Sequence, residues 1–429
     1  MPCFIAHKFC LYSRCKTGRR GRMIRIGQIS CYRVIISLPF LLATFFFYFI
    51  FWRWGEKGGK GTRWPGLEYG PTPARKELHS YPIYEYTSVY RLQADLQFEE
   101  SLAQKLTSIE KKVMTGLYSS DLKKWDGFSS SNLIANHTIW QIASLREKKL
   151  WSTWATQWSD SNPDWTHIIR TSSPNDLLEI IRSFPELQDA IKRFSYIRKD
   201  LIRHILLWYY GGFYASIDTW SRVALHDCSP ISSVLDSNEI KIGLMIGVAT
   251  DEPFLSFKTM EQWGWLRSFG FSQDVLWAPL RFNPLLKTAI VRSLSHARTH
   301  ETLGKGLGIG FEAKTKLIEE ISGAAMFTDV VLESLSKTLS EDDSLRDPDA
   351  GIARRVTWKK FSKLKKPIWI EGDFTSDYNR THGLAILPIN VWSNSQDHSR
   401  AGSDSVDSAC VNQPHGINLK KTWRDTDFG

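Results

Sequence analysis

The first strong feature of the hydrophobic pattern is one uninterrupted apolar run, VIISLPFLLATFFFYFIFW, which covers residues 34–52 without a charged side chain. A helix of that length rises about 28 Å, which matches the hydrocarbon thickness of a bilayer. A core helix seldom presents apolar residues on every face over such a length. The pattern predicts a single transmembrane helix. A cleaved signal peptide is the alternative, although its apolar region is usually shorter.

On the C-terminal side of this run, the hydrophobic pattern changes twice. Residues 53–81 are rich in Gly, Pro and charge, which is typical of an extended stem, and residues 90–118 carry apolar positions at helical spacing. A compact part begins near Asn132. The predicted organisation is therefore a cytosolic tail at 1–33, an anchor at 34–52, a stem with a helical segment at 53–130, and a folded domain at 131–429.

The compact part alternates short apolar runs with longer stretches of helical period. This alternation predicts an α/β domain, because strands and helices that follow one another in turn build a sheet covered by helices. The expected elements are strand 134–139, helix 145–158, strand 165–170, a helix from about 174, helix 198–210 and strand 213–218.

Charge changes the picture at the N-terminus. The chain carries a formal charge of +10, but residues 1–33 hold eight Lys or Arg and no acid, which leaves +2 for the other 396 residues. So small an excess argues against a folded domain that binds nucleic acid. A basic flank before a membrane span instead predicts a cytosolic N-terminus and a lumenal domain, the type II topology. Binding of nucleic acid or a membrane surface by the tail alone is the remaining alternative.

Cysteines are few in the predicted lumenal part. Cys228 and Cys410 are the two that fall after the anchor, and they form either one disulfide or two buried thiols. No Cys or His spacing of the kind that binds zinc is present.

The segment RKDLIRHILLWYYGGFYASID, residues 198–218, carries the candidate chemistry. Gly211 and Gly212 supply a left-handed residue that ends the helix. The following strand delivers Asp218 to the edge of the sheet, where α/β folds bind their ligands. Asp200 and Arg203 lie three apart and therefore on one helix face, where they form either a surface ion pair or a site for a sugar hydroxyl and a diphosphate.

The order R-x-D-x-x-R, apolar helix, GG-x-Y and x-x-D resembles glycosyltransferase family 32, which contains the fungal initiation-specific α-1,6-mannosyltransferases. The resemblance implies a GT-A-like, Rossmann-like fold that binds a nucleotide sugar, and an Asp-x-Asp motif that meets a divalent cation, Mn²⁺ or Mg²⁺. The motif here is Ser216-Ile217-Asp218, so the first carboxylate is a hydroxyl while the second, the metal ligand, is present.

Other residues acquire roles from the same resemblance. Asp218 and Thr422 would bind the cation, and Asp200, Arg203 and Asp218 would form the catalytic set. The residues implied to bind the donor are Trp140, Gln141, Asp200, Arg203, Tyr214, Ser216 and Trp423.

The function implied is that of a Golgi type II membrane enzyme. It would transfer a hexose with retention, mannose from GDP-mannose or a hexose from a UDP-sugar, to a glycan on a protein or lipid. Because Ser216 replaces an acid, a weakened or inactive protein that binds nucleotide or glycan as a scaffold is the second hypothesis. Asp-to-Ser replacement in such a motif can remove several kcal/mol of transition-state stabilisation.

Overall fold

The computed structural model describes part of the chain, and every statement below concerns that part. The described residues are 95–115, 133–171, 185–237, 240–263, 265–300, 318–352, 354–372, 383–396, 398–403 and 405–413. The expected tail, anchor, extended stem and helix from 174 lie outside these ranges. Within them, no helix combines the length and the apolar character needed to cross a membrane. The described residues all belong to one unit, 64–429.

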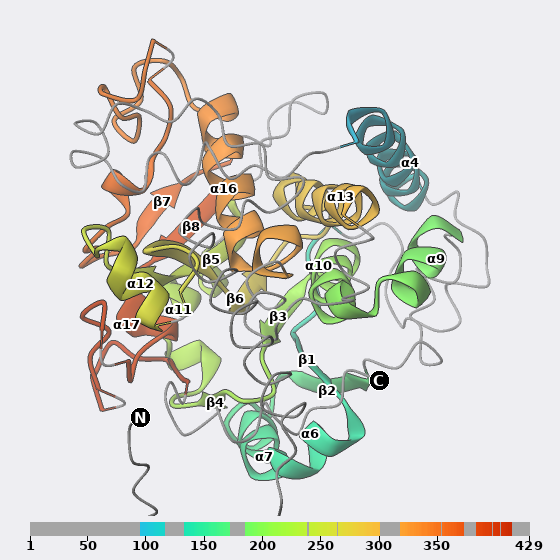
Figure 1. Cartoon of the computed structure of the whole chain (residues 1–429). Coiled ribbons are helices and arrows are strands. Elements are labelled where there is room, and N and C mark those ends of the chain that lie inside the picture. The colour runs from blue at the N-terminus through green and yellow to red at the C-terminus, as the bar shows by residue number, and fades with distance from the viewer. Residues whose placement is uncertain are drawn as a thin grey trace, which may run out of the picture. The chain divides into compact units, whose positions relative to one another are not determined.

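A central sheet of seven strands organises the described residues, in the order β2-β1-β3-β6-β5-β8-β7 (Figure 1). Strands β1, β2 and β3 are mutually parallel, β6 is antiparallel to both β3 and β5, β8 is parallel to β5, and β7 is antiparallel to β8. The bounds are β1 Thr138–Ala143, β2 Thr166–Thr171, β3 Gly212–Ala215, β5 Ile242–Asp251, β6 Phe269–Ala278, β7 Ile368–Ile370 and β8 Gly383–Leu387. A small second sheet pairs β4, Trp220–Ser221, with β9, Val411–Asn412.

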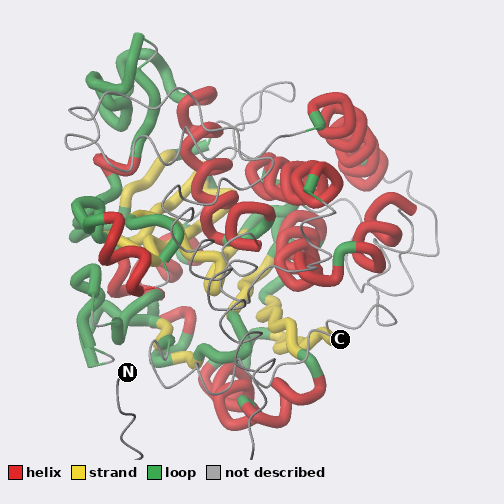
Figure 2. Tube along the Cα trace, in the orientation of Figure 1, coloured by secondary structure: helices red, strands yellow, loops and turns green. Residues whose placement is uncertain are grey.

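Helices cover both faces of this sheet, as the tube in Figure 2 illustrates. On β3, Tyr214 joins one buried cluster while Phe213 and Ala215 join another, as the alternation of side chains along a strand requires. The first cluster is packed by α4 Leu96–Met114, α9 Pro185–Arg193, α10 Arg198–Tyr209, α13 Pro284–Thr299 and α16 Ala324–Thr338. The second is packed by α7 Ser152–Ser161, α11 Ser229–Leu235 and α17 Ile389–Trp392. The predicted α/β class is confirmed.

The remaining elements are short. Helix α6, Leu145–Leu150, begins at a capping box formed by Ser144 and Glu147, and α12 covers Phe257–Trp263. Three 3₁₀ turns cover Ser195–Ile197, Leu225–Asp227 and Trp358–Lys360. The helix predicted over 145–158 is thus two helices, α6 and α7, which meet at Trp151.

The connection between α10 and β3 is as tight as the sequence predicts. Gly211 and Gly212 have φ angles of +67° and +95°. A Cβ on Gly211 would stand 2.4 Å from Ala135 Cβ, and one on Gly212 would stand 2.7 Å from the Thr138 carbonyl oxygen. Positive φ and close neighbours together require glycine at both positions. Because so short a link reverses the chain, the first turn of α10 lies toward the carboxyl end of β3.

A disulfide joins Cys228 and Cys410, with 5.5 Å between their Cα atoms. Cys228 precedes α11 and Cys410 precedes β9, so the bond fastens the last described segment to the body of the domain. Pairing of β9 with β4 and a hydrogen bond from Asn394 to Asn412 hold the same segment. Of the two possibilities left by the sequence, the structure has the bonded pair.

Candidate functional site

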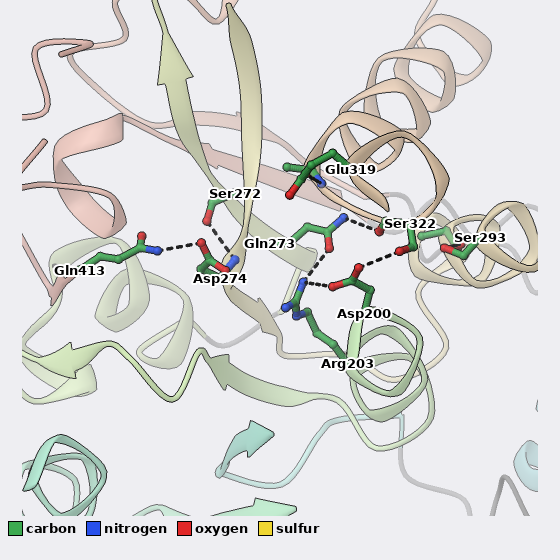
Figure 3. A network of polar contacts seen from close by, with 11 residues as sticks. Asp200, Arg203, Ser272, Gln273, Asp274, Ser293, Glu319, Ser322 and Gln413 are labelled. Carbon is green, nitrogen blue, oxygen red and sulfur yellow. Dashed lines mark hydrogen bonds and ion pairs between the residues drawn. The ribbon is translucent and has the colours of Figure 1, made fainter. Parts of the chain in front are cut away.

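A closed ring of polar contacts lies on one face of the N-terminal half of α10 (Figure 3). Asp200 Oδ1 lies 3.2 Å from Arg203 Nη1, which also donates to Gln273 Oε1 at 2.6 Å. Gln273 Nε2 donates to the Ser322 carbonyl oxygen at 3.1 Å, and the Ser322 hydroxyl donates to Asp200 Oδ2 at 2.7 Å. The ring therefore ties α10 to β6 and to the turn before α16. Asp200 and Arg203 share one helix face, as predicted.

The pair is buried and is not a surface ion pair. The side chains of Arg203 and Asp200 are 9% and 18% exposed. Burial raises the pKa of the Asp200 carboxyl, and Arg203 only partly offsets that rise. Burial lowers the pKa of Arg203, but Tyr214 and Asp200 outweigh it, so this pKa ends above its ordinary value. The guanidinium lies 4.8 Å from the centre of the Tyr214 ring.

The segment after β3 is fixed by its backbone. The Ser216 N–H donates to the Asp274 carbonyl oxygen at 2.7 Å, and the Ser216 carbonyl accepts from Thr219 Oγ1 at 2.7 Å and from Gln141 Nε2 at 3.2 Å. β3 ends at Ala215, so the predicted extension of this strand to Asp218 is wrong. At Ser216 the chain leaves the sheet, because the Ser216 carbonyl bonds Thr219 within a turn and no longer pairs with a neighbouring strand.

Asp218 follows that turn at the carboxyl end of β3. Its Oδ1 atom is buried and has no hydrogen-bond partner among the described residues. Burial raises the pKa of Asp218, the negative charge of Asp274 raises it further, and a hydrogen bond with Ser216 lowers it. A buried carboxylate oxygen without a hydrogen-bond donor is costly, and a bound cation or a proton removes that cost.

Asp274 is the site residue that sequence reasoning missed. It lies on β6, and its Oδ2 accepts from Gln413 Nε2 at 2.7 Å (Figure 3). Its charge raises the pKa of Asp200 and of Asp218, after the larger effect of burial. The available signal was an acid in the middle of the apolar run FGFSQDVLWA, since charged residues are rare on interior strands unless they serve a site.

Glu319 is a further acid near this group (Figure 3). Its Oε2 accepts from the Ala324 N–H at 2.9 Å. Burial and, after it, the charge of Asp200 raise the pKa of Glu319 to about 7. Glu319 is therefore partly protonated near neutral pH, in contrast to an ordinary surface glutamate.

Three residues expected to bind the donor are buried. Trp140 is 2% exposed, and its indole N–H donates to the Gly211 carbonyl oxygen at 2.8 Å, so its ring presents no open face to a nucleotide base. Gln141 is fully buried, and its Nε2 donates to the Ser216 carbonyl oxygen. Its Oε1 lies 2.9 Å from His167 Nε2. Tyr214, 2% exposed, packs under Arg203. In this structure all three support the site from within the core.

The remaining expected residues, Thr422 and Trp423, lie outside the described range, which ends at Gln413. Among described residues, no cluster of three or more His, Cys, Asp or Glu side chains is arranged to hold a metal ion. Asp218 and Asp274 nevertheless offer carboxylate oxygens, the kind of ligand that a hard cation prefers. The donor chemistry therefore suits Mg²⁺ or Mn²⁺ bound together with a nucleotide.

Fold and site together define an α/β protein with a buried acidic site at the carboxyl end of a central parallel strand. Comparison with known proteins is consistent with this class. Residues 148–236, which include Asp200, Arg203 and Asp218, match the family model described as "Glycosyltransferase sugar-binding region containing DXD motif".

Two curated fungal proteins match over longer stretches. The initiation-specific alpha-1,6-mannosyltransferase of Candida albicans is 23% identical over 267 residues, 57% of this chain and 65% of the relative. The putative glycosyltransferase HOC1 of Saccharomyces cerevisiae is 22% identical over 234 residues, 51% of this chain and 54% of the relative. The chain thus spans less than two thirds of either relative. Over these stretches the chain is similar to DXD-type sugar transferases, as the motifs at 198–218 predict.

Solved structures give weaker matches. The PaToxG glycosyltransferase aligns with a TM-score of 0.28 and 13% identity, over 56% of this chain and 81% of that one. The galactosyltransferase LgtC, solved with donor and acceptor sugar analogs, aligns with a TM-score of 0.24 and 13% identity, over 43% of this chain and 70% of that one.

Proposed function

We propose that this protein is a glycosyltransferase with a GT-A-like domain that transfers a hexose from a nucleotide donor to a glycan on a protein or lipid. The observation that supports the proposal is the buried pair of Asp200 and Arg203 on α10, because Asp274 acts electrostatically both on this pair and on Asp218, just beyond β3. Mannose from GDP-mannose is the donor we favour, because the Candida relative is named a mannosyltransferase. Transfer with retention follows from the family resemblance.

In this proposal Asp218 binds a divalent cation, Mn²⁺ or Mg²⁺, which when bound neutralises charge on the leaving diphosphate. Thr422 would add an oxygen ligand. The buried Oδ1 of Asp218, which has no donor among the described residues, supports this role.

Asp200 would accept a hydrogen bond from a hydroxyl of the donor sugar. Arg203 favours the ionised form of Asp200 and orients it, because its Nη1 pairs with Asp200 Oδ1 while Gln273 fixes the guanidinium. Gln141 fixes the Ser216 turn, and Tyr214 supports the guanidinium from below. Trp423, from the C-terminal segment, would cover the diphosphate.

The proposed location is the Golgi membrane, with residues 34–52 as the anchor and the catalytic domain in the lumen. The disulfide between Cys228 and Cys410 supports an oxidising compartment for the domain, because cytosolic thiols are kept reduced. The basic tail supports the orientation, because positive residues flank the cytosolic side of a span.

Donor hydrolysis tests the activity without knowledge of the acceptor. The full-length protein, purified in detergent, would be incubated with GDP-mannose and with UDP-hexoses, in Mn²⁺ or in EDTA, and the released nucleotide diphosphate measured. We expect Mn²⁺-dependent release from one donor. Asp218→Asn should lower the rate by about a hundredfold or more, whereas Asp342→Asn, at an exposed position, should leave it unchanged. Equal rates for both variants, or no release from any donor, would refute the proposal.

One observation favours a second function. Ser216 stands where the family carries an acid, so the protein is alternatively a nucleotide- or glycan-binding scaffold with little turnover. Such a protein would bind GDP or UDP in the presence of Mn²⁺ and release no diphosphate from any donor. Ser216→Asp would then raise hydrolysis from background, whereas in an active enzyme it would change the rate only modestly.

A further inference from the structure

We propose that Asp274 provides the carboxylate that is missing at position 216, so that Asp218 and Asp274 together bind the divalent cation. The inference rests on the proposed function, because it concerns the same site. It assigns to β6 a ligand that the Ser-x-Asp motif lacks. It also explains how a chain with one motif carboxylate keeps an acidic site.

The geometry comes from the register of two neighbouring strands. Ala215 on β3 pairs with Val275 on the antiparallel strand β6. The next residues, Ser216 and Asp274, lie just beyond the paired part of β3 and are joined by the hydrogen bond from Ser216 N–H to the Asp274 carbonyl oxygen at 2.7 Å. Residues directly opposite one another in an antiparallel pair carry side chains on the same face, about 5 Å apart at Cβ. In this proposal the Asp274 side chain, from the opposite strand, takes the place of the carboxylate that position 216 lacks.

The orientation of Asp274 is set by Gln413, whose Nε2 donates to Asp274 Oδ2 at 2.7 Å. The Asp274 backbone N–H is engaged by the Ser272 hydroxyl at 3.1 Å. A carboxylate held in one rotamer loses less entropy on binding an ion than a free one does. Gln413 thus positions Asp274 and is not itself a ligand in this proposal.

The surroundings favour a cation. Asp274 acts electrostatically on Asp200, Asp218 and Glu319, and Arg203 is the cation that pairs with Asp200. Lys199, which also acts on Asp200 and Asp218, is engaged with Glu147 in an ion pair. Among the described residues of this group, acidic side chains therefore outnumber basic ones.

A second observation, independent of the strand register, also points to a cation at this site. Asp218 Oδ1 is buried and meets no hydrogen-bond donor among the described residues. Buried carboxylate oxygens in native proteins are almost always satisfied. A hard cation between Asp218 and Asp274 would satisfy this atom, and two carboxylates with phosphate and water oxygens complete the coordination that Mn²⁺ and Mg²⁺ take at such sites.

The test measures binding of Mn²⁺ to the full-length protein, first alone and then with GDP, by electron paramagnetic resonance of the free ion. Asp274→Asn preserves the shape of the side chain and its contact with Gln413. We expect it to weaken Mn²⁺ binding at least tenfold, with Asp342→Asn as the exposed control. Thermal unfolding without metal establishes that each variant is folded.

A double variant makes the test specific. Ser216→Asp combined with Asp274→Ser moves the carboxylate back to β3, and we expect it to recover most of the affinity that Asp274→Asn loses. Wild-type affinity in Asp274→Asn, or no recovery in the swapped variant, would overturn the inference. Its failure remains distinguishable from failure of the proposed function. Mn²⁺ binding that depends on Asp274 without donor hydrolysis would refute the transferase alone, and hydrolysis that depends on Asp218 but not on Asp274 would refute the inference alone.

Discussion

Removal of the disulfide is the perturbation whose magnitude the structure allows us to work out most directly. Cys228 and Cys410 are 182 residues apart, so the bond closes a long loop in the unfolded chain. The chain-entropy model gives about 5 kcal/mol of stabilisation for a loop of this size, near the upper limit observed for disulfides. Alanine at both positions avoids burying a new hydroxyl group, since Cys228 and Cys410 are 1% and 5% exposed.

The assay compares guanidinium unfolding of wild type and the Cys228→Ala, Cys410→Ala variant, followed by tryptophan fluorescence. The variant should lose about 5 kcal/mol in the free energy of unfolding, and reduced wild type should behave in the same way. Binding of Mn²⁺ should also weaken, because Gln413 follows β9 and contacts Asp274. A loss below about 1 kcal/mol would refute the reasoning, because it would mean that the unfolded chain gains little freedom when the bond is absent.

Three further predictions concern positions outside the disulfide. Gly211→Ala adds a methyl group at φ +67° and 2.4 Å from a neighbouring side chain, so urea unfolding should show a loss of about 2–5 kcal/mol, and a loss below 1 kcal/mol would contradict the clash. Burial and, after it, a neighbouring arginine lower the pKa of His204 to about 3. Stability should therefore fall as pH drops below 6.5, by about 2 kcal/mol at pH 5, and this part of the fall should vanish in His204→Leu when unfolding is measured at pH 7 and pH 5. Arg267 bonds the buried Glu320 and Asp329, so Arg267→Met should lower the melting temperature by about 10 °C, and an unchanged temperature would show that the carboxylates do not need this partner.

Local chemistry made several elements predictable. Helix α10 was expected at 198–210 and occupies Arg198–Tyr209, and its end follows from the glycine pair. Strand β2 was expected at 165–170 and occupies Thr166–Thr171. Strand β1 was expected at 134–139 but occupies Thr138–Ala143, because pairing with β2 on one side and β3 on the other extends the ladder past the polar Gln141. Sheet pairing of this kind is not written in the local pattern.

The candidate site was predictable only where its residues are near in sequence. Asp200 and Arg203 share a helix face, and that spacing alone indicated their contact. Gln273 and Ser322, which complete the ring, are 70 residues from Arg203 and 122 from Asp200, and only the fold joins them. Asp274 escaped prediction for the same reason, since its place opposite Ser216 depends on how β6 aligns with β3.

The closed ring on one face of α10 limits which substitutions the protein can accept during evolution. Each member of the ring forms a hydrogen bond or ion pair with the next; the members are Asp200, Arg203, Gln273 and Ser322. Substitution of one member therefore leaves a buried charged or amide group of its neighbour without a hydrogen-bond partner. Single substitutions at these four positions should therefore be rare in evolution. Among descendants of this chain the four identities should be inherited as a set, and replacements should occur jointly.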